Sequence, residues 1–553
     1  MDAEDLKGIA MSRRSALKRT AGVAFLLSQA TLLEQLASPI VRPAAAATTF
    51  SDIQFDMGAF INPAMVLNDG AGNVTAQIAP TYALLQPVKL NRTPTRADQT
   101  MLANALNTIE ASYPASPSGV LIFSVSYGLP YFNRLPQSVV RANMPTALAT
   151  GRPVLVEAVP SPTDVVGGLV GGPGALVPGV TKDRFNVNLV IEGNDMLFHF
   201  RSDSMVNLSA IPLWFQGSNN LNGTGVPSPN FNGLFTFQTP RIQFVQIGLP
   251  RRLANNYGFE FAPRMNPNST MVMGFLDQQT NAAGPAAITT FAGNSSAKLT
   301  NAVAGSYFDN GSIAHLSHNI EDAYQFYATP GQDPRHPDGE PFTERCQYMF
   351  RSNQLGTPNG IPAAGNADQY TNGGGPAYIN NVFQGTGAAA AGAADTAGVF
   401  TPTNATLNAT FTGEGRIGHE AALQQVSRAS DGTPLHIRAD GPGLDGMDVP
   451  AFRTFPTNIG SNMPAGSAQF KLQFLIYVPT ADFFASMRSA QAAQNLQVQN
   501  PNVNPDDNGL ERFITSTRRQ NFLVPPRRHR AFPLVELASS DGPNRGTRGP
   551  RRR

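Results

Sequence analysis

The stretch Met273-Gly274-Phe275-Leu276-Asp277-Gln278-Gln279-Thr280-Asn281 decides how the rest of this chain is interpreted. It places one carboxylate, Asp277, in a glycine-entered turn directly after two apolar residues. A carboxylate with such neighbours is partly desolvated, which suits proton transfer at a buried site. The competing interpretation is a turn aspartate that caps its own backbone. Asp277 is therefore the first candidate for a catalytic residue.

Outward from this stretch, the chain alternates between strand-like and helix-like segments. The predicted strands are rich in β-branched and aromatic residues and cover Gly119 to Tyr127, Phe185 to Ile191, Arg241 to Ile247 and Phe470 to Val478. The predicted helices cover Arg96 to Ser112 and Thr480 to Gln494. This alternation predicts an α+β fold in which helices pack on antiparallel sheets, although it does not select a topology. We find no internal sequence repeat.

Two later segments add candidates for a site. His436-Ile437-Arg438 follows a turn-rich run that ends in Thr433-Pro434-Leu435, and Phe452-Arg453-Thr454 lies 17 residues beyond the histidine (453 minus 436). Near the end comes Phe522-Leu523-Val524-Pro525-Pro526.

Taken in order, these motifs resemble the dye-decolorizing (DyP-type) peroxidase family. The first stretch is similar to its Gly-x-x-Asp-Gly signature, with Gln278 in place of the second glycine, and His436 to Arg438 is similar to its His-x-Arg motif. The resemblance spans residues 119–526 by scattered motifs. It implies two ferredoxin-like lobes with antiparallel sheets, of the dimeric α/β-barrel type, and a haem b cofactor.

The resemblance also implies roles for single residues. Asp277 and Arg453 would act on hydrogen peroxide, His436 would be the proximal ligand of the haem iron, and Gly274 and Arg438 would contact the cofactor. His419 and His315 are the alternative iron ligands. The expected partners are hydrogen peroxide and an unknown reducing substrate, and an oligomer is compatible with the sequence.

The N-terminus resembles a twin-arginine export signal. Ser12-Arg13-Arg14-Ser15 precedes a mildly apolar run, and Ala44 to Ala47 offers a cleavage site. We therefore expect residues 1–47 to be a signal peptide and the protein to be periplasmic or extracellular. No later segment is apolar enough to predict a membrane span. The remaining predicted limits are 48–285 for the N-terminal lobe, 286–536 for the haem-binding lobe and 537–553 for a basic disordered tail.

Composition narrows the function classes. Cys346 is the one cysteine, which excludes an intramolecular disulfide, Fe–S clusters and cysteine-rich zinc sites. A net charge of +2 argues against a nucleic-acid footprint across the protein. The segment 355–409 is dominated by Gly, Ala, Asn, Pro and Thr and is interpreted as a loop-rich insertion. Hydrolase and nucleotide-binding motifs are missing from the sequence.

Several alternatives stay open at this point. His315 and His318, followed by Glu321 and Asp322, could hold a metal if they lay on one helix face, and a calcium loop could use Asp440, Asp445 and Asp448. Tyr324, Tyr327 and Tyr348 are candidate surface aromatics for radical transfer. The chain could also be a degenerate relative without peroxidase activity, or a noncatalytic exported binding or surface protein.

Overall fold

The computed structural model describes residues 31–37, 50–56, 58–61, 65–68, 73–76, 79–167, 169–170, 182, 185–265, 269–273, 286–293, 298–327, 419, 426, 435–451, 464–492, 500–502 and 509–538. Within these residues, no helix combines the length and the apolar character that a membrane crossing requires.

The first lobe is built on four antiparallel strands with two helices on one face. In chain order its elements are β3 (Tyr82–Leu90), α3 (Arg96–Ser112), β4 (Leu121–Gly128), β8 (Met196–Ser202), α6 (Met205–Phe215) and β11 (Phe235–Phe237), with β12 (Arg241–Phe244) also paired to β3. The strands lie in the order β11-β3-β8-β4. This is the ferredoxin-like arrangement, in which the first and third strands are central.

The second lobe repeats this arrangement. Its elements are β13 (Ser312–Glu321), β14 (Ile437–Arg438), β15 (Gly441–Asp445), β16 (Gln469–Val478), α15 (Ala481–Gln491) and β17 (Ile514–Val524). The strands lie in the order β17-β13-β16-β14, and β15 pairs with β16 beyond β14. Each lobe therefore places its last, first, third and second strands side by side. The predicted α+β fold with two ferredoxin-like lobes is confirmed.

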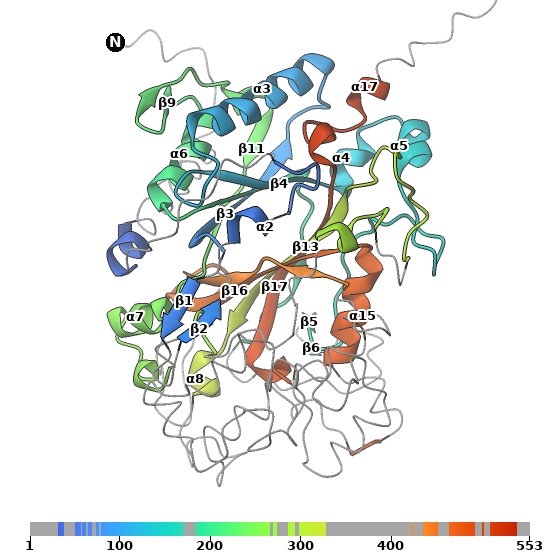
Figure 1. Ribbon diagram of the computed structural model, residues 1–553. Coiled ribbons are helices and arrows are strands. Elements are labelled where there is room, and N and C mark those ends of the chain that lie inside the picture. The colour runs from blue at the N-terminus through green and yellow to red at the C-terminus, as the bar shows by residue number, and fades with distance from the viewer. Residues whose placement is uncertain are drawn as a thin grey trace, which may run out of the picture.

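The two lobes form one sheet that curls back on itself. Strand β4 joins β17 through the pairs Tyr127↔Leu523 and Gly128↔Phe522. On the other side β12 lies against β15, and a Cβ added to Gly443 would come within 2.5 Å of the Ile242 carbonyl oxygen. Only glycine permits this close approach of the two backbones. Figure 1 shows α3 and α6 on the outer face of the first lobe and α15 beside the second.

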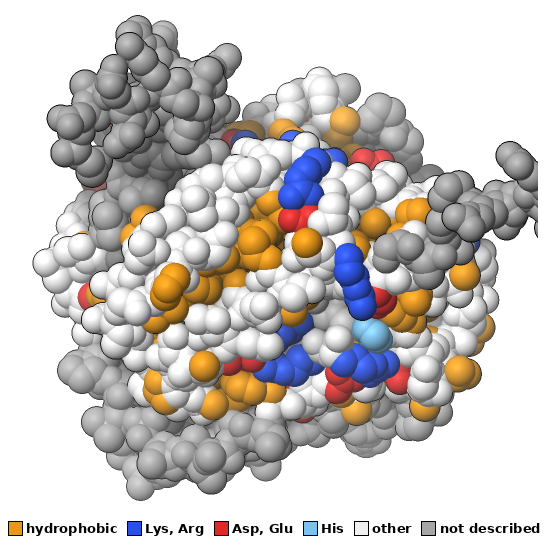
Figure 2. All heavy atoms as spheres, turned by 90° about the horizontal axis from the view of Figure 1, so that it is seen from above, with side chains coloured by type: hydrophobic (Ala, Val, Ile, Leu, Met, Phe, Trp, Pro, Cys, Tyr) orange, Lys and Arg blue, Asp and Glu red, His pale blue; other side chains and the backbone are white. Residues whose placement is uncertain are grey.

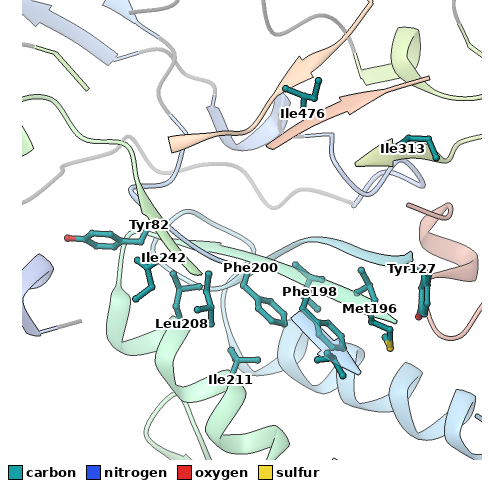
Figure 3. Packing of buried hydrophobic residues seen from close by; sticks show 14 of the residues in the cluster. Tyr82, Tyr127, Met196, Phe198, Phe200, Leu208, Ile211, Ile242, Ile313 and Ile476 are labelled. Atoms are coloured by element: carbon teal, nitrogen blue, oxygen red, sulfur yellow. The ribbon is translucent and has the colours of Figure 1, made fainter. Parts of the chain in front are cut away.

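Helix α3 illustrates how local sequence and packing agree. Thr95 caps its N-terminus in a reciprocal capping box with Asp98, and Leu102, Leu106 and Ile109 are buried on one face. Its observed bounds equal the predicted ones. The core of this lobe lies between the helices and the sheet, where Phe198 and Phe200 from β8 face Leu208 and Ile211 from α6 (Figure 3).

Two predicted strands are shorter than expected. Of Arg241 to Ile247, only Arg241–Phe244 forms a strand, β12. Of Phe185 to Ile191, only β7 (Val190–Ile191) is a strand, paired in parallel with β17. The preceding residues find other partners, because Thr515 Oγ1 donates to the Phe185 carbonyl and Leu189 N–H donates to the Val165 carbonyl. A β-rich composition therefore did not produce a ladder there.

The remaining helices and strands are short. They are α2 (Gly58–Ile61), β1 (Met65–Asn68), β2 (Asn73–Ala76), α4 (Leu129–Asn133), α5 (Gln137–Asn143), β5 (Val165–Val166), β6 (Leu169–Val170), β9 (Asn220–Leu221), β10 (Thr224–Gly225), η1 (Phe231–Gly233), α7 (Leu249–Asn256), η2 (Ala262–Arg264), η3 (Ala286–Thr289), α8 (Ala323–Phe326), η7 (Glu511–Phe513), η8 (Arg527–His529) and α17 (Val535–Ala538).

Both described ends of the chain pack on the first lobe. Residues 31–36 are helical, Leu33 is buried, and its carbonyl accepts a hydrogen bond from the Tyr82 hydroxyl. At the other end, the Tyr131 hydroxyl donates to the Pro533 carbonyl. The signal peptide predicted over residues 1–47 stays a prediction.

The basic residues that follow β17 are compensated by acidic neighbours. Arg528 pairs with Asp309 at 2.5 Å, and Arg530 pairs with Glu110 at 2.5 Å. Seen from above, this face carries basic side chains beside acidic ones (Figure 2). Residues 539–553 of the predicted basic tail and the whole insertion 355–409 lie outside the described residues.

Candidate active site

A cavity lies between the helix-facing side of the second lobe's sheet and α15. Its walls come from every strand of that lobe except β15. The lining residues are Met271, Met273, Ser317, Asn319, Glu321, His419, Arg438, Leu472, Phe474, Phe484, Arg488, Gln491, Leu510, Ile514, Ser516 and Arg519. Met273 begins the stretch that opened the sequence analysis, and Arg438 ends the His-x-Arg motif. Two motifs that are far apart in sequence thus meet at one cavity.

The cavity is lined by both apolar and polar side chains. The apolar ones include Phe474 and Phe484, together with the two methionines and three aliphatic residues. Polar ones follow β13, where Ser317, Asn319 and Glu321 recur at every second residue, beside Phe474 and Leu472 of the neighbouring β16. Side chains at this spacing in a strand share one face. A molecule with a flat apolar body and a few polar groups would match these walls.

Two of the three arginines on the wall form buried ion pairs. Arg488 makes a bidentate pair with Glu511, with both N–O distances at 2.8 Å. Arg519 pairs with Asp164 at 2.6 Å, and both side chains are almost fully buried. Burial would raise the pKa of Asp164, but the charges of Arg519 and Arg488 outweigh it and leave the pKa of that carboxyl below its usual value. The two arginines are thus held in place on the cavity wall by carboxylates that lie behind it.

The third arginine, Arg438, is held from outside the cavity. Its Nη2 lies 2.8 Å from Oδ2 of Asp440, two residues along the chain. Each arginine on the wall thus has a carboxylate partner that is not itself on the wall. The described lining contributes a single carboxyl group, that of Glu321.

Glu321 lies at the end of β13 and is 3% exposed. Gln469 Nε2 donates to its backbone carbonyl, but its carboxyl Oε2 has no hydrogen-bond partner among the described residues. Burial, with a smaller contribution from the charge of Asp440, raises the pKa of Glu321 to about 8. The carboxyl group is therefore protonated at neutral pH.

His315, one alternative iron ligand, is not arranged to bind a metal. Its Nδ1 is 2.6 Å from Asn521 Oδ1, its Nε2 is 2.8 Å from Ser317 Oγ, and its ring stacks on Phe484 with centroids 3.3 Å apart. Burial, and then the charge of Arg519, lower the pKa of His315 well below its usual value. Both ring nitrogens are engaged, so the ring serves packing and hydrogen bonding.

His419 and His436 differ in how they relate to the cavity. His419 lies on the wall, and Gln491 Nε2 donates to its Nδ1 at 3.1 Å. This bond leaves the proton of a neutral ring on Nε2, the nitrogen that would otherwise bind iron. His436 is 1% exposed and directly precedes β14. It lies two residues before Arg438 in the chain and is not among the described residues that line the cavity.

Three predicted site residues cannot be placed. Asp277, Gly274 and Arg453 lie outside the described residues, as does Tyr348. The described chain reaches Met273, where the Tyr327 hydroxyl anchors the neighbouring Val272 carbonyl at 2.8 Å. Asp277 follows Met273 by four residues in the sequence.

Two alternatives from the sequence are wrong. His315 and His318 lie on a strand, not a helix, so residues three apart point to opposite faces and cannot share a metal. His318 faces Asp445, with Nε2 and Oδ2 3.3 Å apart. The proposed calcium loop is also excluded, because Asp445 contacts His318, and Asp448 and Asp440 pair with arginines. Within the described residues no group of His, Cys, Asp or Glu could hold a metal ion.

The interpretation of Tyr324 and Tyr327 as surface aromatics is also wrong. Tyr324 is 9% exposed and Tyr327 is fully buried. Both rings pack on Phe261, which comes from the segment after α7. Their aromatic character therefore reflects the core.

The residues around the cavity fit a haem in three respects. A buried imidazole, His436, lies two residues before Arg438, the wall contains apolar and aromatic side chains, and the guanidinium of Arg438 is itself on the wall. Haem sites in proteins combine an axial imidazole with such an apolar pocket.

Comparisons with known proteins found similarity to solved structures only. No family model and no curated protein matches the chain. The encapsulated DyP-type peroxidase from Mycobacterium smegmatis is 14% identical, covering 85% of this chain and 97% of its own, with a TM-score of 0.36. A dye-decolorizing peroxidase from Bacteroides thetaiotaomicron and DyPB from Rhodococcus jostii are each 12% identical with TM-scores of 0.40; they cover 84% and 82% of this chain, and 98% and 94% of their own.

Sequence reasoning missed the buried charges of the cavity. Arg519 stands inside the strand-like run Ile514–Val524, and Arg488 lies on a predicted helix. A charged residue inside a strand that is otherwise buried is the signal that could have identified Arg519. Glu321 was considered only as a metal ligand.

Proposed function

We propose that this protein is a haem-dependent peroxidase that uses hydrogen peroxide to oxidise a reducing substrate. The observation that carries the proposal is the meeting of Met273 and Arg438 at one largely apolar cavity. The first residue begins the stretch with Asp277, and the second ends the motif with His436. The sequence predicts the same chemistry for both motifs. If each motif only formed a local turn, we would not expect the two to line the same cavity.

In this proposal the chain's residues divide the work. His436 binds the iron of haem b, Arg438 and Gly274 contact the cofactor, and the apolar wall excludes water. The haem, when bound, supplies the redox chemistry. Asp277 moves a proton to or from peroxide, and Arg453 stabilises the charge that develops as the O–O bond breaks.

The test is His436→Ala in protein purified from haem-supplied cells. We expect the variant to lose its haem or to change the Soret absorption, because the axial bond to iron is gone. His419→Ala is the matched control, since it removes an imidazole from the cavity wall and should retain haem. Unchanged haem content and spectrum in His436→Ala would move the ligand elsewhere. A wild-type protein that binds haem without turnover of peroxide and a dye would be a degenerate relative.

We also propose export by the twin-arginine pathway. The support is the pair Arg13 and Arg14 with the alanine-rich boundary near residue 47. Changing both arginines to lysine should leave full-length precursor in the cytoplasm, measured by fractionation and immunoblotting. Normal export of this double variant would contradict the assignment.

A further inference from the structure

Glu321 supplies the carboxyl group of the described cavity wall, and this carboxyl group forms no ion pair with a described residue. It is 3% exposed and lies on the same strand face as Ser317 and Asn319. Its Oε2 has no hydrogen-bond partner among the described residues. A buried carboxyl group without a partner costs free energy in the folded protein. Such a group in a cavity points to a ligand that completes its hydrogen bonds.

The charged groups around Glu321 already have partners. Three arginines on the neighbouring elements form ion pairs: Arg438 with Asp440, Arg488 with Glu511 and Arg519 with Asp164. Lys471 donates to the Met447 carbonyl, and Arg512 lies over the Phe513 ring. Because the nearby cations serve other partners, none of them neutralises Glu321. Among their charges, that of Asp440 acts on Glu321, and it disfavours ionisation.

We propose that Glu321 is a proton donor to the molecule bound in this cavity. The inference rests on the proposed peroxidase function for the identity of that molecule. Reduction of hydrogen peroxide to two water molecules consumes two electrons, which the reducing substrate supplies, and two protons. Glu321 provides one of these protons, is left as a carboxylate, and is reprotonated from solvent.

Two observations make the group suited to this role. The carboxyl lines the cavity from the same strand face as Ser317 and Asn319, so it can donate to an oxygen of a bound molecule. With a pKa of about 8, the carboxyl group carries its proton at neutral pH. This pKa is also close enough to the ambient pH for the group to lose and regain the proton. Asp277 is expected from a different segment, so the two carboxyl groups are separable by mutation.

The first experiment needs no haem. The infrared spectrum of the wild type at pH 7, minus that of Glu321→Gln, should contain the carbonyl stretch of a protonated carboxylic acid. This band should disappear as the pH is raised through about 8. Glu157→Gln, the same change at an exposed site, should give no such band. A missing band in the wild type at pH 7 would overturn the proposal, whatever the protein does with peroxide.

The second experiment uses the haem-loaded protein and stopped-flow mixing with peroxide. The wild-type rate should fall as pH rises through about 8, and Glu321→Gln should be slower by about 10²- to 10⁴-fold below that pH and lose this dependence. Glu321→Asp, which retains a carboxyl group, should recover part of the rate. Thermal melting confirms that each variant is folded.

The outcomes separate the two proposals. Absence of a Soret band and of turnover in the wild type would end the peroxidase proposal, and with it the role of Glu321 toward peroxide. A wild type that turns over, with Glu321→Gln keeping its rate and pH profile, would end the Glu321 proposal alone.

Discussion

The two lobes share one strand order, but their first strands present different chemistry to the helices. In β3 the residues that pack toward the helices include Leu84, Val88 and Leu90, all in the apolar core. In β13 the corresponding face carries Ser317, Asn319 and Glu321 on a cavity wall. The same topology thus closes over an aromatic core in one lobe and leaves a cavity with polar groups along its first strand in the other. Side chains, not topology, distinguish the two copies of the fold.

The difference extends to how each lobe is stabilised. The first lobe relies on contacts such as that of Phe198 with Phe215, whose ring centroids are 5.3 Å apart. The second contains buried ion pairs that reach the cavity. Apolar packing tolerates loss of one group in a graded way, whereas an unpaired buried charge is costly.

The largest expected effect is in the second lobe. Asp164→Ala should lower the free energy of unfolding by about 3–5 kcal/mol, because Arg519 would be left buried without its counter-charge. Denaturant titration measures the change, with the exposed Glu157→Ala as the control, expected within about 0.5 kcal/mol of wild type. A loss below about 1 kcal/mol for Asp164→Ala would mean that the lobes are stabilised alike.

A mutation that creates a cavity in the core of the first lobe should lower the free energy of unfolding without changing the candidate active site. Leu208 on α6 is fully buried, so Leu208→Ala should lower the free energy of unfolding by about 2–5 kcal/mol. Under the proposed function, the haem content of the folded variant should equal that of the wild type. Val206→Ala on the same helix, where the side chain is 66% exposed, is the matched control. Loss of haem from folded Leu208→Ala would show that the lobes are not independent in function.

The third effect is a pH dependence that belongs to the second lobe. The folded protein holds the Glu321 proton up to about pH 8, whereas the unfolded chain releases it near 4.5. Stability from this group is therefore complete below pH 4.5 and is lost as pH rises toward 8, by at most about 1.4 kcal/mol per pH unit. Glu321→Gln should remove this decline, measured by denaturant unfolding at several pH values. An identical pH profile in both proteins would contradict the assignment.

The acid side of the same profile should be common to both proteins. Burial lowers the pKa of His199, His315 and His318 from 6.5. The unfolded chain then binds protons that the folded protein does not, so stability is lost as pH falls below about 6.5. The contrast between wild type and Glu321→Gln thus isolates the alkaline side.

Sequence by itself determined the local elements that have strong signals. The helix over Arg96–Ser112 follows from its cap and its apolar spacing, and β16 follows from the run Phe470 to Val478. Motif order also identified Arg438, which the structure places on the cavity wall. These features depend on neighbours in the chain, which a sequence displays directly.

Tertiary structure alone decided the repeat of the two lobes and the state of the charges. The lobes share strand order without sequence similarity, because many sequences satisfy the same pattern of buried faces. The sequence around His315 and His318 was equally compatible with a helix, and only pairing with β16 and β17 fixed a strand. Whether Glu321 holds a proton depends on burial and on which partners the arginines take, and these are set by residues distant in the chain.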